Sequence, residues 1–183
     1  GRSWLQEGRL KGGAVVATVM SNLGLERFLN DLGVGLERTP VGDRYVVERM
    51  RKGGYRFGGE QSGHLIFLDH ATTGDGIVAA LQVLTLLVER QVSLSSIADT
   101  VMDTVPQVLV NERFDKRAAL KSMTNLSRTM TAVEKKLGKK GRVVVRWSGT
   151  EPKLRVMVEG DSDDKIRKHA ADLMAAARLD LAS

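Results

Sequence analysis

Apolar residues in the first part of the chain alternate between short continuous runs and runs with helical spacing. Residues 14–20 form a continuous, β-branched apolar run, which predicts a buried strand. The apolar positions within 25–32 then share one helical face, and Gly33 ends that pattern. A strand that leads directly into a helix is half of a β-α-β unit, so a parallel sheet is predicted here.

Predicted strands and helices continue to alternate as far as Pro106. Asp43 is the predicted cap of a short helix that Gly53 and Gly54 end, and Asp75 and Ser93 are the predicted caps of two later helices. The ranges predicted as strands are 36–39, 55–57 and 65–68, and those predicted as helices are 43–50, 77–91 and a short one from 93.

The remainder of the chain has a different element order. Residues 108–110 predict a strand, and Asp115 is the predicted cap of a long helix that Gly138 ends. Strands 142–147 and 154–158 are joined by a tight loop, and a last helix runs from 161–164 to about 179. This β-α-β-β-α order predicts a mostly antiparallel sheet with helices on one face.

The composition excludes several classes of protein. The 183 residues include no cysteine, which excludes a disulfide scaffold and a cysteine-ligated metal site. No apolar run reaches the ~20 residues that a membrane-spanning helix needs, and the first residues lack the apolar core of a secretory signal. His70 and His169 have no second ligand at metal spacing, so no metal is assigned. A cytoplasmic protein is expected.

Charge is unevenly distributed between the two parts. Residues 1–105 carry 11 basic and 12 acidic side chains, whereas residues 107–183 carry 17 and 10. This asymmetry indicates an anionic partner for the second part, either nucleic acid or a phosphorylated small molecule, with a solvated basic surface as the third option. Few aromatic residues lie among the basic ones, which weakens the nucleic-acid alternative.

Two loops carry residues suited to a phosphorylated sugar. Arg146, Ser148, Gly149 and Thr150 surround one tight turn, where hydroxyls, backbone N–H groups and a guanidinium can surround phosphate oxygens. Arg155 leaves the same turn and adds a second charge. An ordinary hairpin turn remains the alternative.

The glycine-rich loop 58–64 places Glu60 and Ser62 where they can bind sugar hydroxyls, and His64 is a candidate general acid or base. The glycines are expected to allow unusual backbone angles, and a plain glycine-rich turn is the alternative. Asp43 and Arg44 form a further loop, in which Arg44 is a candidate anion contact and a helix cap is the simpler interpretation.

Taken together, these loops resemble the α-D-phosphohexomutases. The resemblance rests on four segments in this order: 42–44 (Gly-Asp-Arg), 58–64 (Gly-Gly-Glu-Gln-Ser-Gly-His), 72–76 (Thr-Thr-Gly-Asp-Gly) and 146–152 (Arg-Trp-Ser-Gly-Thr-Glu-Pro). Gln61 is more similar to the bacterial phosphoglucosamine mutase branch than to the phosphomannomutase/phosphoglucomutase branch.

The resemblance implies a C-terminal fragment of a four-domain protein. Residues 1–106 would be the third domain, a Rossmann-like three-layer α/β/α domain with the sugar-binding loop, lacking its first strand. Residues 107–183 would be the fourth, a small TBP-like antiparallel-sheet domain with the phosphate-binding loop. The phosphorylated serine and the Asp-Gly-Asp metal loop of the family have no counterpart in this sequence.

The resemblance also implies roles for the loop residues. Arg146, Ser148, Gly149 and Thr150 match the loop that grips the non-reacting phosphate, and Arg155 is added from its position in the sequence. Glu60 and Ser62 match residues that hold ring hydroxyls, and His64 matches a proposed general acid or base. Asp43 and Arg44 match the helper loop.

The activity implied for the intact protein is isomerisation of glucosamine 6-phosphate to glucosamine 1-phosphate through a phosphoserine and a bisphosphate intermediate. This is a step toward UDP-N-acetylglucosamine and peptidoglycan precursors, and it implies Mg²⁺ and a sugar bisphosphate activator, neither bound by residues present here. The partners implied are a hexosamine phosphate and the N-terminal domains, with a homodimer left open and no nucleic acid or membrane. The fragment alone is expected to be inactive. Glucose or mannose phosphate specificity and a basic nucleic-acid-binding module are the alternatives.

Overall fold

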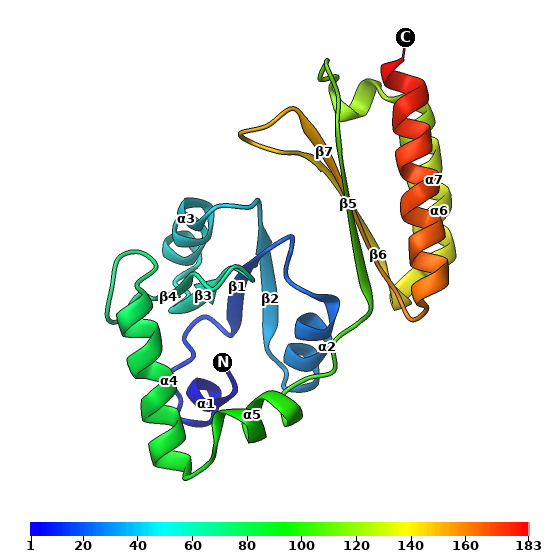
Figure 1. The fold of residues 1–183 in the computed structure, drawn as a ribbon. Helices are drawn as coiled ribbons and strands as arrows, with labels where there is room; N and C mark the ends of the chain where they lie inside the picture. The colour runs from blue at the N-terminus through cyan, green and yellow to red at the C-terminus, as the bar shows by residue number, and fades with distance from the viewer. Residues whose placement is uncertain (183) are drawn as a thin grey trace. The chain divides into compact units, whose positions relative to one another are not determined.

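The computed structural model describes residues 1–182. The chain forms two compact units that meet between Thr104 and Val105 in the sequence, and each unit has its own sheet and core (Figure 1). The first unit contains strands β1 (Ala14–Thr18), β2 (Gly35–Thr39), β3 (Phe57–Gly59) and β4 (Leu65–Phe67), and helices α1 (Arg2–Gln6), α2 (Leu23–Asp31), α3 (Asp43–Gly53), α4 (Gly76–Arg90) and α5 (Leu94–Thr100). Its strand order is β2-β1-β3-β4; β2 and β3 pair with β1 in parallel, and β4 is antiparallel to β3.

Helices cover both faces of this sheet, because neighbouring residues of β1 point to opposite sides. Val15 packs with residues of α1, α2 and α4 in one apolar cluster, whereas Val16 packs with Val46 and Met50 of α3 in another. The first unit is therefore the three-layer α/β/α arrangement that the family resemblance implied.

The second unit is a sheet with helices on one side. Its elements are β5 (Gln107–Arg113), the short 3₁₀ helix η1 (Leu120–Ser122), α6 (Thr124–Leu137), a second one η2 (Gly138–Lys140), β6 (Arg142–Trp147), β7 (Lys153–Glu159) and α7 (Asp163–Leu181). The strand order β5-β7-β6 is antiparallel throughout. This agrees with the α+β layer expected from the sequence.

Strand alternation separates the two faces of this sheet. Leu154, Val156 and Val158 of β7 belong to the buried cluster that contains residues of α6 and α7. The residues between them, Arg155 and Met157, point to the side that α6 and α7 do not cover, which we call the open face; Arg155 is half-buried there and Met157 is buried. Cross-strand pairing then places Arg146 of β6 and Asn111 of β5 beside Arg155 on the open face.

Several predicted details are wrong. Asp115 does not cap α6, which begins nine residues later at Thr124. Met123 is the N-cap residue, and its side chain makes no capping hydrogen bond. Instead, the Asp180 carboxylate of α7 accepts hydrogen bonds from the backbone N–H groups of Asn125 (3.1 Å) and Leu126 (2.9 Å). The helix thus takes its cap from a residue far along the chain, which local sequence could not reveal.

Two predictions about the first unit also change. Gly42, with φ of +131°, is the N-cap of α3, and Asp43 is the first helical residue. The strand expected at 55–57 begins instead at Phe57 and includes Gly59, where a Cβ would lie 2.6 Å from the carbonyl oxygen of His64. Gly59 is therefore required for space rather than for an unusual backbone angle.

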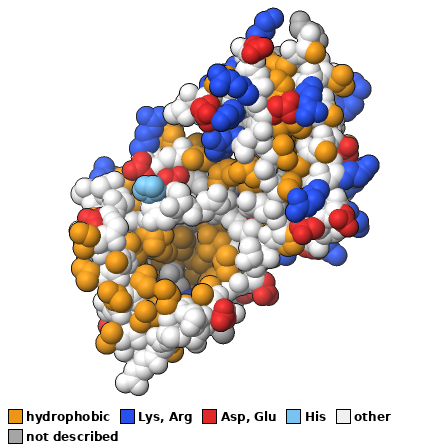
Figure 2. Space-filling model, viewed as in Figure 1, with side chains coloured by type: hydrophobic (Ala, Val, Ile, Leu, Met, Phe, Trp, Pro, Cys, Tyr) orange, Lys and Arg blue, Asp and Glu red, His pale blue; other side chains and the backbone are white. Residues whose placement is uncertain are grey.

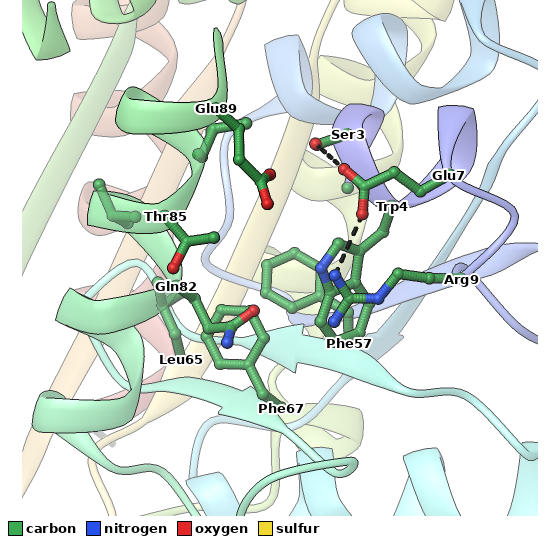
Figure 3. Close-up of a pocket in the computed structure, with 13 residues that line it drawn as sticks. Ser3, Trp4, Glu7, Arg9, Phe57, Leu65, Phe67, Gln82, Thr85 and Glu89 are labelled. Carbon is green, nitrogen blue, oxygen red and sulfur yellow. Dashed lines mark hydrogen bonds and ion pairs between the residues drawn. The ribbon is translucent and has the colours of Figure 1, made fainter. Parts of the chain in front are cut away.

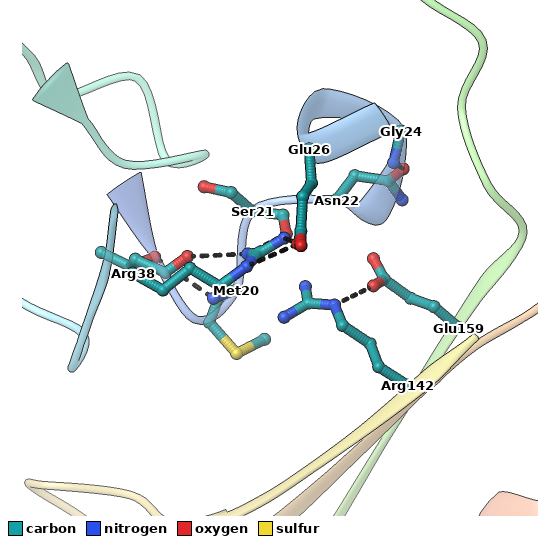
Figure 4. A network of polar contacts seen from close by, with 9 residues as sticks. Met20, Ser21, Asn22, Gly24, Glu26, Arg38, Arg142 and Glu159 are labelled. Carbon is teal, nitrogen blue, oxygen red and sulfur yellow. Dashed lines mark hydrogen bonds and ion pairs between the residues drawn. The ribbon is translucent and has the colours of Figure 1, made fainter. Parts of the chain in front are cut away.

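Ion pairs hold strand ends within each unit (Figure 4). In the first unit, Arg38 of β2 binds the Glu26 carboxylate at 3.0 Å and the carbonyl oxygen of Ser21 at 2.7 Å, which fixes the chain after β1. In the second unit, Arg142 of β6 pairs with the buried Glu159 of β7. No helix within residues 1–182 is both long enough and apolar enough to cross a lipid bilayer.

Candidate functional site

The loops that follow β2 and β3 meet at one edge of the first sheet. Both strands run parallel to β1, so their carboxyl ends lie at the same edge, where ligands bind in open α/β sheets. Glu60 directly follows β3, and its Oε1 accepts a hydrogen bond from the backbone N–H of Gly42 at 3.0 Å. The structure therefore brings the glycine-rich loop and the predicted helper loop together.

Glu60 is only partly engaged by this contact. Its carboxylate is half-buried, and the bond to Gly42 uses one of its two oxygens. The backbone N–H of Glu60 donates to the carbonyl oxygen of His64 at 2.9 Å, which closes the loop into a tight turn. Gly63 takes a φ of +95° in this turn, so the expectation of unusual backbone angles holds at this glycine.

Ser62 and His64 lie at the exposed tip of the same turn. Ser62 Oγ and His64 Nδ1 are 3.0 Å apart, a hydrogen bond whose direction depends on the histidine tautomer. Both side chains are exposed, so a ligand can reach them without displacing protein.

The helper loop contacts the segment before α4 as well. Thr73 Oγ1 donates to Asp43 Oδ2 at 3.5 Å, and Asp75 accepts from the N–H groups of Ile77 (2.8 Å) and Val78 (2.9 Å) as the predicted cap of α4. Arg44 instead lies over the ring of its neighbour Tyr45, with its guanidinium carbon 4.5 Å from the ring centre. In this conformation Arg44 binds an aromatic side chain and is exposed, so it is not preset as an anion contact.

Two arginines lie side by side on the open face of the second unit. Arg146 of β6 and Arg155 of β7 are direct cross-strand partners. The Nε atoms of both are buried and have no hydrogen-bond partner. Burial, and then the positive charge of Arg155, lower the pKa of Arg146. A pair of cations with unsatisfied donors in a partly buried position is suited to bind an anion.

The turn beside this pair is fixed by its backbone. Ser148 N–H donates to the carbonyl oxygen of Lys153 at 2.8 Å, and Lys153 N–H donates to that of Glu151 at 2.8 Å. Ser148 is buried, whereas Gly149 and Thr150 are exposed. A Cβ at Gly149 would meet no atom within 4 Å, so the space over this residue is open.

The chain after β5 supports the same turn from outside. Trp147 Nε1 donates to the carbonyl oxygen of Ala118 at 2.8 Å, and Phe114 N–H donates to that of Pro152 at 2.9 Å. Arg117 donates to the carbonyl oxygen of Glu151. These contacts hold the turn before any ligand is present.

Three polar residues near the arginine pair were not singled out from the sequence. Asn111 of β5 is the cross-strand partner of Arg155. Two residues further along β5, Arg113 is the cross-strand partner of Lys153 on the same face. Residues 107–113 (Gln-Val-Leu-Val-Asn-Glu-Arg) show no alternation of apolar and polar types, so the sequence carried no signal for these positions. The alternating exposure along β5, and the strand pairing that places these residues beside Arg155, come from the structure.

The first unit also has an apolar hollow, seen in Figure 2 as an orange-lined depression and enlarged in Figure 3. It encloses about 150 Å³ beside the rings of Trp4, Phe57 and Phe67, with Gln82 and Glu89 of α4 along one side. None of the predicted site residues lines it. The hollow is therefore separate from the loops described above.

The described residues do not provide a metal centre. Within residues 1–182, no three His, Asp or Glu side chains are grouped so that they could hold a metal ion. A Mg²⁺ ion requires several oxygen ligands in near-octahedral geometry. The residues present do not fit this ion, so no step is assigned to it here.

Comparison with known proteins gives consistent matches along the chain. Residues 1–105 match the family model described as phosphoglucomutase/phosphomannomutase, alpha/beta/alpha domain III, and residues 108–176 match the model for the C-terminal domain of the same name. A phosphoglucosamine mutase of Sorangium cellulosum is 58% identical over 178 residues, which are 97% of this chain and 37% of that protein. One of Rhodospirillum centenum is 52% identical and covers 96% of this chain and 37% of its own length. The chain thus spans little more than a third of these relatives.

Solved structures show the same fold. An N-acetylphosphoglucosamine mutase of Aspergillus fumigatus covers 98% of the chain and 40% of its own length with a TM-score of 0.78 at 19% identity. A structure of the same fungal enzyme in complex with GlcNAc-6P and magnesium covers 97% of the chain and 41% of its own length, with a TM-score of 0.77 at 17% identity. At these identities the likeness concerns the fold.

Proposed function

Since the chain belongs to the phosphoglucomutase/phosphomannomutase family, we propose that it forms the sugar- and phosphate-recognition part of a phosphoglucosamine mutase. The intact enzyme would interconvert glucosamine 6-phosphate and glucosamine 1-phosphate. The identities of 58% and 52% to phosphoglucosamine mutases support this substrate over other hexose phosphates. The first unit would recognise the sugar and the second unit a phosphate.

The second unit would hold the phosphate that does not react. Arg146 and Arg155 would donate to the phosphate oxygens, and the hydroxyls of Ser148 and Thr150 with the N–H groups of Gly149 and Thr150 would surround them. The unpartnered Nε atoms of both arginines are the single observation that carries this proposal. Buried donors are almost always satisfied in proteins, so two neighbouring cationic donors left open on one face support an anionic ligand there.

The first unit would hold the sugar ring. The free oxygen of Glu60 and the hydroxyl of Ser62 would orient two ring hydroxyls, and His64 would exchange a proton with the reacting oxygen as a general acid or base. The bond between Glu60 and Gly42 ties this loop to Asp43 and Arg44, which would support the ring from the helper loop.

Phosphoryl transfer itself would require groups that this sequence does not contain. The chain has neither a Ser-His-Asn-Pro segment nor an Asp-Gly-Asp loop, so the phosphoserine and the Mg²⁺ site would come from the rest of the intact protein. A bisphosphate intermediate would turn over between the two half-reactions. Binding of the distant phosphate would position the reacting one, and the chain alone would be inactive.

Calorimetric titration of the chain with glucosamine 6-phosphate tests this proposal. Arg146→Ala should weaken binding about tenfold or more, because a charge-assisted contact is lost. Arg128→Ala, an exposed arginine on α6, is the matched control and should bind like the original chain. Equal affinity in the Arg146→Ala variant would remove Arg146 from the site. Glucose 6-phosphate, mannose 6-phosphate and a generic oligonucleotide in parallel titrations would reveal a different specificity.

A further inference from the structure

Glu151 places a negative charge inside the cluster of cations on the phosphate-binding turn. Its Oε1 lies 2.7 Å from Lys153 Nζ, and its Oε2 lies 3.9 Å from Nη2 of Arg155. The hydrogen bond from Lys153 holds the pKa of Glu151 below its usual value; burial opposes this, and the charges of Lys153, Arg155 and Arg113 add to the lowering. The carboxylate is therefore ionised at neutral pH.

The side chain of Glu151 is not what shapes the turn. The carbonyl oxygen of Glu151 accepts from Lys153 N–H and from Arg117, and Ser148 N–H and Phe114 N–H bind other backbone oxygens of the loop. All of these contacts use main-chain acceptors. We therefore expect them to remain when the Glu151 carboxylate is replaced, so that its charge is removed without removing the main-chain contacts of the turn.

Arg155 is the arginine of the pair that this carboxylate approaches. Arg146 has no carboxylate within ion-pair distance among residues 1–182, whereas Arg155 has Glu151. An anion that binds both guanidinium groups would meet the Glu151 carboxylate as a neighbouring like charge on the same turn. It would also have to compete with Glu151 for Arg155.

We propose that Glu151 is an affinity-setting residue whose carboxylate competes with the substrate phosphate for Arg155 and thereby weakens the phosphate grip. This inference rests on the proposed function, in which the bound phosphate must leave so that the intermediate can turn over. Two arginines that bind one phosphate dianion through charge-assisted hydrogen bonds oppose its release, and a competing carboxylate would lower that opposition. When the phosphate leaves, the Glu151 carboxylate would remain as the anion beside Arg155, 3.9 Å from its Nη2.

Glu151→Gln tests the proposal in the full 183-residue chain, because it removes the charge and preserves the shape. Titration with inorganic phosphate and with glucosamine 6-phosphate at low salt should show roughly three- to tenfold tighter binding, as expected for removal of a nearby like charge at a partly exposed site. The gain should shrink at high salt, where the charges are screened. Glu151→Asp, which retains the charge, should bind like the original chain.

Glu112→Gln is the matched control. It removes a carboxylate of the same unit that pairs with Arg178, and its cross-strand partner is the buried Leu154, so it lies on the helix-covered face. Its phosphate affinity should not change.

The outcomes separate this inference from the proposed function. Unchanged or weaker phosphate binding in Glu151→Gln, with Arg146→Ala still defective, would overturn the inference and leave the function standing. A gain that persists at high salt, or that Glu151→Asp reproduces, would also overturn it. Absence of phosphate binding in both the original chain and Glu151→Gln would overturn both.

Discussion

Arg146 lies directly opposite Arg155 in the antiparallel ladder of β6 and β7, so two positive charges face each other on the open face of the sheet. Like charges at such positions oppose folding. Burial, and then the charge of Arg155, lower the pKa of Arg146, so the second of these causes is the same cross-strand repulsion. The pair therefore costs stability that an anion between the two guanidinium groups would return.

Arg155→Met should separate these two effects. Without phosphate, the variant should unfold at an equal or higher temperature, gaining up to about 1 kcal/mol from relief of the cross-strand repulsion. Phosphate should raise the unfolding temperature of the original chain but not of the variant, because a ligand stabilises only the state that binds it. Thermal unfolding with and without phosphate measures both. A lower unfolding temperature without phosphate would mean that Arg155 is structural.

Glu60→Ala should affect the sugar but not the phosphate. The change removes the acceptor of the Gly42 N–H bond and the oxygen available to a ring hydroxyl, so glucosamine 6-phosphate should bind more weakly while inorganic phosphate binds as before. In the intact enzyme, turnover should fall. Glu60→Gln retains an acceptor for Gly42 and is the control for loop structure. Equal loss of sugar phosphate and inorganic phosphate binding would indicate a purely structural Glu60.

Asp180→Ala should destabilise the second unit by about 1 kcal/mol, the usual cost of losing a helix cap. Burial acts against ionisation of Asp180, but the N–H groups of Leu126 and Asn125 outweigh it and lower the pKa of this carboxyl. Urea unfolding of the variant, compared with Asp172→Ala on the exposed side of α7, measures the effect. Equal stability of the two variants would show that α6 needs no cap from α7.

The sequence predicted elements that depend on local chemistry. Asp75 was expected to cap α4 and does so, because its carboxylate binds N–H groups two and three residues ahead. Asp115 was expected to cap α6 and does not, since the helix begins at Thr124 and its capping carboxylate is Asp180. Spacing along the chain carries no information about a partner fifty-five residues away.

The candidate site shows the same limit. Parallel strands could place the loops after β2 and β3 at one edge, but the bond from Gly42 to Glu60 required the fold. Arg155 was identified because it follows the turn closely, and only the strand register showed that it faces Arg146. The position of Asn111 beside Arg155 was known only from the pairing of β5 with β7. Residues brought together by strand register are not visible as a motif.

His169 should make the stability of the second unit depend on pH. The imidazole is buried, its Nδ1 has no partner, and burial followed by the charge of Lys136 lowers its pKa. The unfolded chain therefore takes up a proton near the ordinary histidine pKa of about 6.5, which the folded chain resists. Above that pH, His169 does not reduce the free energy of unfolding. As the pH falls through that value, the unfolded chain binds the proton more readily and the free energy of unfolding decreases. Between about pH 7.5 and 5.5 the free energy of unfolding in urea should fall more in the original chain than in His169→Gln, whereas His70→Gln, at an exposed position, should retain the full slope. An identical slope in His169→Gln would show that His169 is protonated equally in the folded and unfolded chains.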